Sequence, residues 1–163
     1  MMNLITDRTA WDVERWRVLR NKGWDNMTET ERQEWLGNII TTPSAVRGMY
    51  THNDLNRVES AVKVLSARLK EYGYLCSNLP VKTNWTYSDE LTKEDVERYY
   101  GNIARIRRTC AAYENTPQAP TIEQKLNFER ANNIEKILVD IDDATTKMSK
   151  SWYYVGDVMS GEV

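Results

Sequence analysis

The sequence predicts an all-α fold, a bundle of about five helices with irregular loops. Three observations indicate it. Glycine is scarce, at 7 of 163 residues. Apolar residues recur at steps of three and four along most of the chain, which is the spacing of one helix face. Thr residues followed three positions later by Asp or Glu precede several of these stretches, as at typical helix starts. The length fits a single helical domain, residues 1–163.

Residues 1–37 form the first section, which contains two short helices rich in tryptophan. We expect the first over residues 9–21, ending before Gly23, because glycine favours the position after a helix. The second opens at Thr28, whose spacing to Glu31 is that of a capping box, and stops near Gly37. Four indoles are expected to form a small satellite core: Trp11, Trp16, Trp24 and Trp35.

Residues 51–151 are expected to hold three long helices, over 53–72, 93–113 and 122–150. For the last of them, a break near Asn127 stays open. Stretches with proline or clustered turn residues separate them. Each helix has a narrow apolar stripe that must pack against other helices. The stripes are Leu55, Val58, Val62, Leu65 and Leu69 in the first helix, Val96, Tyr99, Ile103, Ile106 and Cys110 in the second, and Ala131, Ile134, Leu138, Ile141 and Thr145 in the third.

The starts of the first two long helices have the same pattern, in which Asp follows Thr by three positions and Arg follows Asp by three. Thr is expected to cap the helix and Asp to face its positive end. The residues are Thr51, Asp54 and Arg57 in one helix and Thr92, Asp95 and Arg98 in the other. The third helix shares Asn132 and Glu135 with Asn56 and Glu59 of the first. Two interpretations stay open: an internal repeat, or the general pattern of capped amphipathic helices.

Composition argues against several classes of function. Lys and Arg total 22 against 24 Asp and Glu, and the net charge of -2 argues against a general nucleic-acid binder. Mean hydropathy is -0.68, and no apolar run is long enough for a membrane span. A single His and 2 Cys leave little for metal or nucleophile chemistry. The chain has no glycine-rich phosphate loop.

The remaining reactive side chains have plain structural interpretations. His52 lies in the first turn of a helix, and Cys110 lies on an apolar stripe. Asp140, Asp142 and Asp143 are neighbours on one helix and do not face each other, so we expect them on a solvated face rather than around a cleft. We therefore expect no enzymatic activity, no catalytic residue, no metal site and no cofactor.

Tyrosine and tryptophan are abundant, with 9 Tyr and 6 Trp against 1 Phe. Their amphipathic rings suit interfaces as well as cores. Three aromatics in a row cannot all face one core, so we expect an ordered aromatic C-terminal tail, residues 152–163, that meets a partner. The candidate partner contacts are Trp85 and Tyr87 in a loop and Trp152, Tyr153 and Tyr154 at the start of the tail.

Segments spread over nearly the whole chain form a pattern that can be compared with known proteins. They are residues 22–28, 34–36, 54–59, 82–85, 131–138 and 160–162, with Tyr50, Arg98, Tyr99, Asn102, Ile103, Arg107 and Gly156. Together they resemble a small family of phage proteins encoded in the tail and baseplate regions of phages and prophages of Gram-positive bacteria. The string at 54–59 is also similar to helical openings of tail-fibre subunits, although Glu97 stands where the second copy would have Asn.

The resemblance implies a non-enzymatic structural protein of the virion, made in the host bacterial cytoplasm. It would be a tail, tail-fibre or baseplate component that acts by protein–protein assembly. Its partners would be other tail or baseplate proteins, or a second copy of the chain, and it would not contact a membrane.

Two alternatives stay open beside this interpretation. Exposed Trp and Tyr faces stack on sugars, so a host-surface polysaccharide is the first alternative partner. Nucleic acid is the second, because arginines alternate with aromatic residues on one helix. Acidic residues just before them fit simple complementation of the helix dipole as well. The residues are Arg98, Arg105, Arg107 and Arg108, around Tyr99 and Tyr100.

Overall fold

The computed structural model describes residues 3–76, 79–110 and 112–159, and of residues 152–159 the backbone alone. All regular structure in these ranges is helical, which confirms the predicted all-α class for them. The elements are α1 Ala10–Lys22, the 3₁₀ turn η1 Trp24–Asn26, α2 Glu29–Trp35, α3 Ala45–Gly48, α4 His52–Glu71, α5 Lys93–Thr109 and α6 Phe128–Met159. None of the helices in these ranges is long and apolar enough to cross a membrane.

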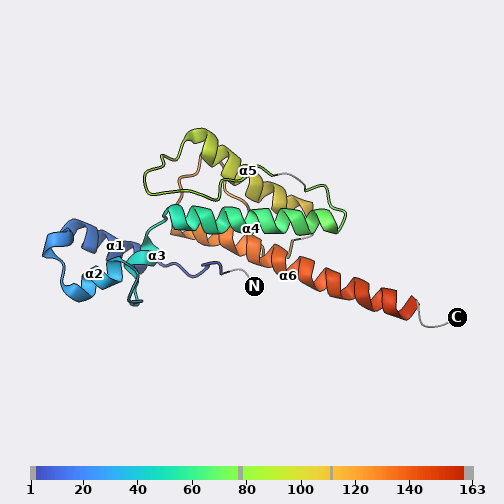
Figure 1. The fold of residues 1–163 in the computed structure, drawn as a ribbon, viewed down its shortest axis with the longest axis horizontal. Coiled ribbons are helices and arrows are strands. Elements are labelled where there is room, and N and C mark those ends of the chain that lie inside the picture. The colour runs from blue at the N-terminus through green and yellow to red at the C-terminus, as the bar shows by residue number, and fades with distance from the viewer. Residues whose placement is uncertain (1–2, 77–78, 111, 160–163) are drawn as a thin grey trace.

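The three long helices form the main body of the molecule. Figure 1 shows α4 and α6 side by side along its long axis, with α5 against both. Their predicted stripes meet in one apolar core, in which each fully buried Leu or Ile contributes at most about 1.5–3 kcal/mol. The fully buried members include Val58, Leu65, Leu69, Ile103, Ile106, Ile134, Ile137, Leu138 and Ile141. Packing of the stripes therefore holds the body together.

A smaller N-terminal lobe, residues 9–50, contains α1, η1, α2 and α3 and lies at one end of the body (Figure 1). It has its own apolar cluster of Leu19, Met27 and Ala45, against which Trp16 and Trp35 pack. The expectation for the other two indoles was wrong: Trp11 is 74% exposed and Trp24 is 47% exposed. So short a segment has too little interior to bury four indoles.

Two buried carboxylates organise the lobe around the start of α3. Asp12 accepts a hydrogen bond from the Ser44 N–H at 2.6 Å, and Glu34 accepts one from the Ala45 N–H at 3.2 Å. Burial alone would raise the pKa of Asp12, but the hydrogen bonds from Ser44 and Thr9 outweigh burial and lower it. Both carboxylates therefore stay charged where they hold the backbone.

The ends of α5 and α6 differ from the sequence-based expectation. α5 ends at Thr109 rather than at residue 113. α6 starts at Phe128 rather than at residue 122, because the Asn127 side chain accepts the Arg130 N–H at 2.9 Å and so caps the helix there. α6 also continues to Met159, where we expected it to end at residue 150 and a tail to follow. It runs beyond the end of α4 in Figure 1.

Candidate functional site

A pair of side chains on α4 clasps an extended segment of backbone, residues 82–85. Asn56 accepts the Trp85 N–H at 2.7 Å and donates to the Trp85 carbonyl at 2.9 Å. Glu59, one turn further along the helix, accepts the Lys82 N–H at 2.6 Å. It also accepts the Trp85 indole N–H at 3.0 Å. The segment is thereby bound to α4 through backbone and side chain at once.

A second pair on α6 makes the same four hydrogen bonds to a different segment, residues 5–8. Asn132 accepts the Arg8 N–H at 3.0 Å and donates to the Arg8 carbonyl at 2.8 Å. Glu135 accepts the Ile5 N–H at 2.6 Å and the Arg8 Nη2–H at 2.8 Å. We call the two segments, residues 5–12 and 82–89, the straps.

The straps also share a sequence pattern, Thr-[Asp/Asn]-x-Thr-x-x-Asp. In each strap the final Asp accepts the N–H of the second Thr, at 2.8 Å for Asp12 and Thr9 and at 2.6 Å for Asp89 and Thr86. In both clasps an asparagine and a glutamate at the same spacing make the same hydrogen bonds to a strap. This agreement favours the internal-repeat interpretation over the general pattern of capped amphipathic helices. The straps could not be found from local sequence patterns, because 124 positions separate Arg8 of the first strap from Asn132 of α6.

Arginines from the capped helix starts connect the two clasps. Arg57 of α4 donates to Glu135 of α6 at 2.7 Å and to Asp54 at 2.5 Å. Arg98 of α5 donates in the same way to Glu59 of α4 at 3.0 Å, and this hydrogen bond raises the pKa of Arg98. Ion pairs thus link α6 to α4 and α4 to α5, and in each of them the arginine of one helix binds the glutamate of the next.

α5 and α6, the two helices at the ends of this series of ion pairs, each lack one half of the pattern. α5 has Glu97 and Tyr100 at the positions of Asn56 and Glu59, so it has no clasp. α6 has Arg130 and Asn133 at the positions of Asp54 and Arg57. α4, in the middle, has both halves. The series of ion pairs therefore ends at these two helices. α5 has no glutamate that a further arginine could bind, and α6 has no arginine that could bind a further glutamate at these positions.

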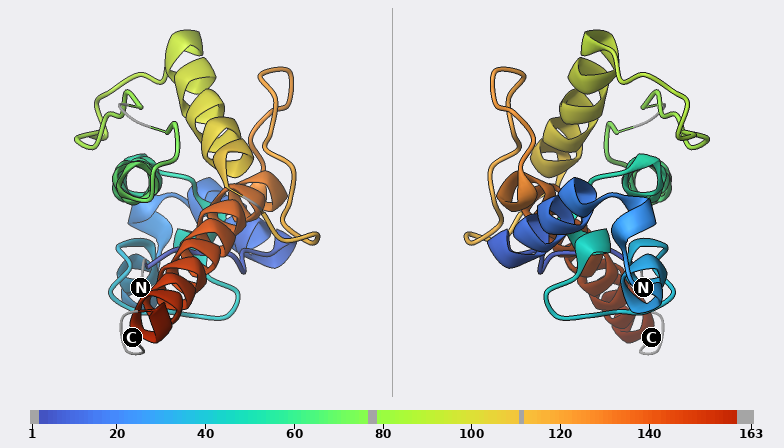
Figure 2. Two further views of the ribbon diagram at one scale, coloured as in Figure 1. Left: turned by 90° about the vertical axis from the view of Figure 1, so that its right-hand side faces the viewer. Right: turned by 90° about the vertical axis from the view of Figure 1, so that its left-hand side faces the viewer.

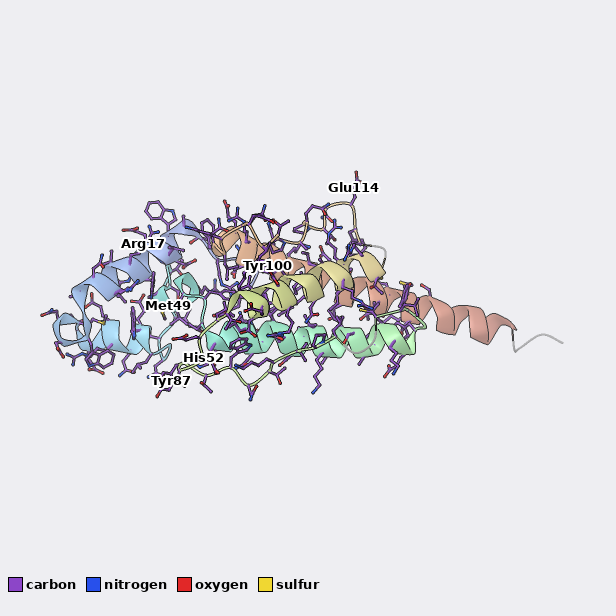
Figure 3. All side chains as sticks on the ribbon, turned by 90° about the horizontal axis from the view of Figure 1, so that it is seen from above. Arg17, Met49, His52, Tyr87, Tyr100 and Glu114 are labelled. Carbon is purple, nitrogen blue, oxygen red and sulfur yellow. The ribbon has the colours of Figure 1, made fainter. Side chains whose placement is uncertain are left out.

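The predicted partner contacts have different outcomes. Trp85 was expected on the surface, and this expectation was wrong: the side chain is 4% exposed, because its indole N–H binds the buried Glu59. Tyr87 is 91% exposed and lies at the outer edge of the molecule in Figure 3. The side chains of Trp152, Tyr153 and Tyr154, and the end of the expected tail, lie outside the described residues.

The predicted capping pairs all form. Glu31 accepts the Thr28 N–H at 2.8 Å, Asp54 accepts the Thr51 N–H at 2.7 Å, and Asp95 accepts the Thr92 N–H at 3.3 Å.

Other polar residues from the sequence analysis are used inside the fold. Asp140 is buried and accepts from Thr116 at 2.8 Å, which corrects the expectation that it faces solvent. Asp142 pairs with Arg68, and Asp143 accepts the Tyr113 hydroxyl at 2.6 Å.

The lobe and the body meet over a cavity of about 570 Å³. Figure 3 shows Arg17 on α1 and Met49 just after α3, both on the lobe side of this junction. The lining contains three arginines and no carboxylate. It consists of Arg8, Ala10, Val13, Trp16, Arg17, Arg47, Gly48, Met49, Tyr50, Thr51, Leu126, Asn127, Phe128 and Ala131. We call it the junction cavity.

A more apolar groove of about 520 Å³ lies between α5 and the segment before α6. It shares Leu126 with the junction cavity, and the two are separated by Tyr50 and Tyr99, whose hydroxyls are 2.5 Å apart. Burial raises the pKa of both tyrosines, so both stay protonated. The rest of its apolar wall consists of Leu55, Leu91, Val96, Tyr100 and Ile122. Lys93 and Lys125 lie beside these side chains. We call it the α5 groove.

The linings of these two hollows have a similar chemical character. Neither lining contains a histidine, a cysteine or a carboxylate that could act as a general base or a nucleophile. Within the described ranges no three His, Cys, Asp or Glu side chains are grouped so that they could hold a metal ion. Both hollows offer apolar walls with cationic side chains instead.

No protein-family model, no curated protein and no solved structure matches this chain.

Proposed function

We propose that this chain is a non-enzymatic assembly protein, a tail, tail-fibre or baseplate component of a phage particle that binds another protein of that particle. The observation that carries the proposal is how the buried charges are used. Glu59 and Glu135 are fully buried, and each is occupied by a strap and an arginine. Both glutamates are thereby engaged in contacts within the fold, which supports a scaffold role. The phage setting rests on the sequence resemblance described above.

The α5 groove is the surface we propose for the partner. Two of its apolar side chains, Leu91 and Ile122, remain 48% and 37% exposed in the isolated chain. Large apolar side chains that protrude around a hollow are typical anchors of protein interfaces. Lys93 and Lys125 beside the groove favour a partner whose apolar segment is flanked by acidic residues.

The experiment is incorporation into particles. Tagged chain is supplied in a host in which the phage copy is deleted, and purified particles are analysed by mass spectrometry. We expect the wild-type chain in the particles and a loss of at least tenfold for Leu91→Asp, because burying one unpaired charge at an interface weakens binding by that much or more. Leu75→Asp is the matched control, since Leu75 is 91% exposed and outside the groove.

Absence of the wild-type chain from particles, or equal incorporation of the Leu91→Asp and Leu75→Asp variants, would contradict the proposal. Circular dichroism of both variants shows whether the helices are intact, so that loss of incorporation is not confused with unfolding.

Part of the basis of each alternative function is occupied inside the fold. Of the two indoles expected to stack on sugars, Trp85 is buried against Glu59, and the side chain of Trp152 lies outside the described residues. Of the four arginines expected to meet nucleic acid, Arg98 is engaged with Glu59 and Arg107 donates to the Pro117 carbonyl at 2.5 Å, while Arg105 and Arg108 are exposed. We therefore place protein–protein assembly ahead of these two alternatives.

A further inference from the structure

A third segment of the chain, residues 117–124, has the backbone pattern of the straps. It ends the same number of positions before α6 as the second strap, residues 82–89, ends before α5. Gln124 accepts the Thr121 N–H at 3.2 Å, as Asp89 accepts the Thr86 N–H. The N–H of Gln124 also donates to the Thr121 carbonyl at 3.1 Å, and that of Asp89 to the Thr86 carbonyl at 3.2 Å. We call residues 117–124 the third strap.

The third strap cannot be clasped as the other two are. The clasp on α4 accepts two N–H groups of the second strap, those of Lys82 and Trp85. The corresponding residues of the third strap are Pro117 and Pro120, which have no N–H. α5 lacks the asparagine and the glutamate of a clasp at the corresponding positions. The strap therefore has neither donor, and the helix has neither clasp residue.

Hydrogen bonds hold the flanks of the third strap against α6 instead. Thr116, just before it, donates to the buried Asp140 at 2.8 Å, and the Lys125 carbonyl, just after it, accepts from Arg130 at 2.5 Å. α5 contacts only the start of the strap in this way, through Arg107, which lies about two turns beyond the clasp position. Figure 2 shows the second and third straps on opposite sides of α5.

We propose that the α5 groove binds an extended segment of the partner protein, which lies along α5 as the clasped straps lie along α4 and α6. This inference rests on the proposed function, because it specifies what the partner places in the same groove. The groove lies between α5 and the third strap. Tyr100, at the position of Glu59, is on one wall, and Ile122 and Gln124 of the strap are on the other. The corresponding face of α4 and of α6 binds extended backbone in this molecule.

The size of the groove favours extended backbone over a helix. The groove encloses about 520 Å³. A helix is about 10 Å wide and rises about 5.4 Å per turn, so a single turn would take most of this volume. An extended segment rises about 3.3 Å per residue and directs alternate side chains to one face. Several of its residues can therefore reach the apolar wall at once.

The lining selects an apolar segment with acidic flanks. Lys93 and Lys125 are the charged residues of the lining, and it contains no carboxylate. Glu97 is 3.6 Å from Lys93, in an exposed pair that water screens. Acidic residues on both sides of an apolar core would therefore meet positive charge at the edges of the groove.

Calorimetric titration of the purified full chain tests the proposal with a panel of probe peptides that have Asp-Asp at both ends. Their cores are Val-Thr-Val-Ile, Ile-Ser-Val-Leu and Phe-Thr-Val-Val, whose β-branched residues favour extended backbone. We expect saturable binding of at least one probe. Binding should be at least tenfold weaker for its version with Lys-Lys ends, and for a version of equal length held helical by a hydrocarbon staple.

One variant of the chain places the binding in the groove. Ile122→Asp should weaken binding of the probe at least tenfold, because it puts a charge into the apolar wall. Leu75→Asp is the matched control outside the groove and should leave binding unchanged. Circular dichroism of both variants shows whether their helices are intact.

Five results would overturn the proposal. They are no saturation by any probe, equal binding of the Asp-ended and Lys-ended versions, preference for the stapled helix, equal effects of Ile122→Asp and Leu75→Asp, and a dimer of the free chain that Ile122→Asp abolishes. The assay separates this inference from the proposed function. If the chain enters particles and no probe binds, this inference alone fails; if a probe binds and the chain is absent from particles, the proposed function alone fails.

Discussion

Asn56 and Asn132 lie on different helices, and each binds both the N–H and the carbonyl of one strap residue, Trp85 and Arg8 respectively. A glutamate three positions further along each helix completes the clasp. The same arrangement thus occurs twice. An extended segment cannot pair its backbone N–H and carbonyl groups within itself, and side chains on a helix face supply the missing partners.

Loss of one clasp should destabilise the chain in a predictable way. Asn132→Ala leaves the N–H and carbonyl of Arg8 without partners in a part-buried place, which costs about 1–3 kcal/mol of unfolding free energy. Asn56→Ala should cost a similar amount. Asn53→Ala, an exposed site on α4, is the control and should change little. Urea denaturation measures all three, and clasp variants as stable as the control would show that the clasps contribute nothing.

The glutamate of the second clasp should be the more sensitive residue. Glu135 is fully buried between Arg8 and Arg57, so Glu135→Gln leaves Asp54 as the one carboxylate paired with these two guanidinium groups. We expect a loss of about 1.5–3 kcal/mol, the usual contribution of hydrogen bonds to a charged group. Glu129→Gln on the exposed surface of the same helix should cost nothing measurable in the same denaturation experiment. Equal stability of the two variants would refute this role for Glu135.

Two glycines should respond to alanine in opposite directions. A Cβ at Gly48 would lie 2.1 Å from the Asp12 carbonyl oxygen, so Gly48→Ala must push α3 away from α1. Gly101 lies on α5 with nothing within 4 Å, so Gly101→Ala should stabilise the helix by about 0.5–1 kcal/mol. Thermal melts should show a lower Tm for the first variant and a higher Tm for the second. An unchanged or higher Tm for Gly48→Ala would contradict the close approach of α3 to α1.

Acid should weaken the second strap. The Lys82 ammonium and the Thr86 hydroxyl and N–H lower the pKa of Asp89 from 3.8 to about 2. A carboxylate whose pKa is lower in the folded state stabilises the fold above its unfolded pKa and loses this effect as pH falls through the folded value. The difference in Tm between wild type and Asp89→Asn should therefore be largest above pH 4 and shrink as the pH approaches 2. A constant difference over this range would exclude a charge effect at Asp89.

The helices could be predicted from sequence because their signals are local. Caps such as Thr92 with Asp95, and stripes at steps of three and four, depend on residues within one or two turns. For the last helix the sequence left open a break near Asn127, and the helix begins directly after this residue, which caps it.

The clasps and the cavity could not be predicted in the same way. Asn132 accepts a hydrogen bond from Arg8, which lies near the other end of the chain. Neither segment contains a local pattern that predicts this contact. Trp85 was expected at the surface because it lies in a loop. In the structure its indole N–H donates a hydrogen bond to the buried carboxylate of Glu59, and the ring is buried with it. The junction cavity brings together residues near 8–17, 47–51 and 126–131, so it exists only once the lobe has packed on the body.

Amide hydrogen exchange tests the strapped, rigid body most directly. Ile5, Arg8, Lys82 and Trp85 lie outside every helix, yet their N–H groups are bound by the clasps. We expect these amides to exchange as slowly as those in the middle of α4, with Asn132→Ala releasing the first pair alone and Asn56→Ala the second pair alone. Exchange of all four in wild type at the rate of open coil would contradict a body held by its straps.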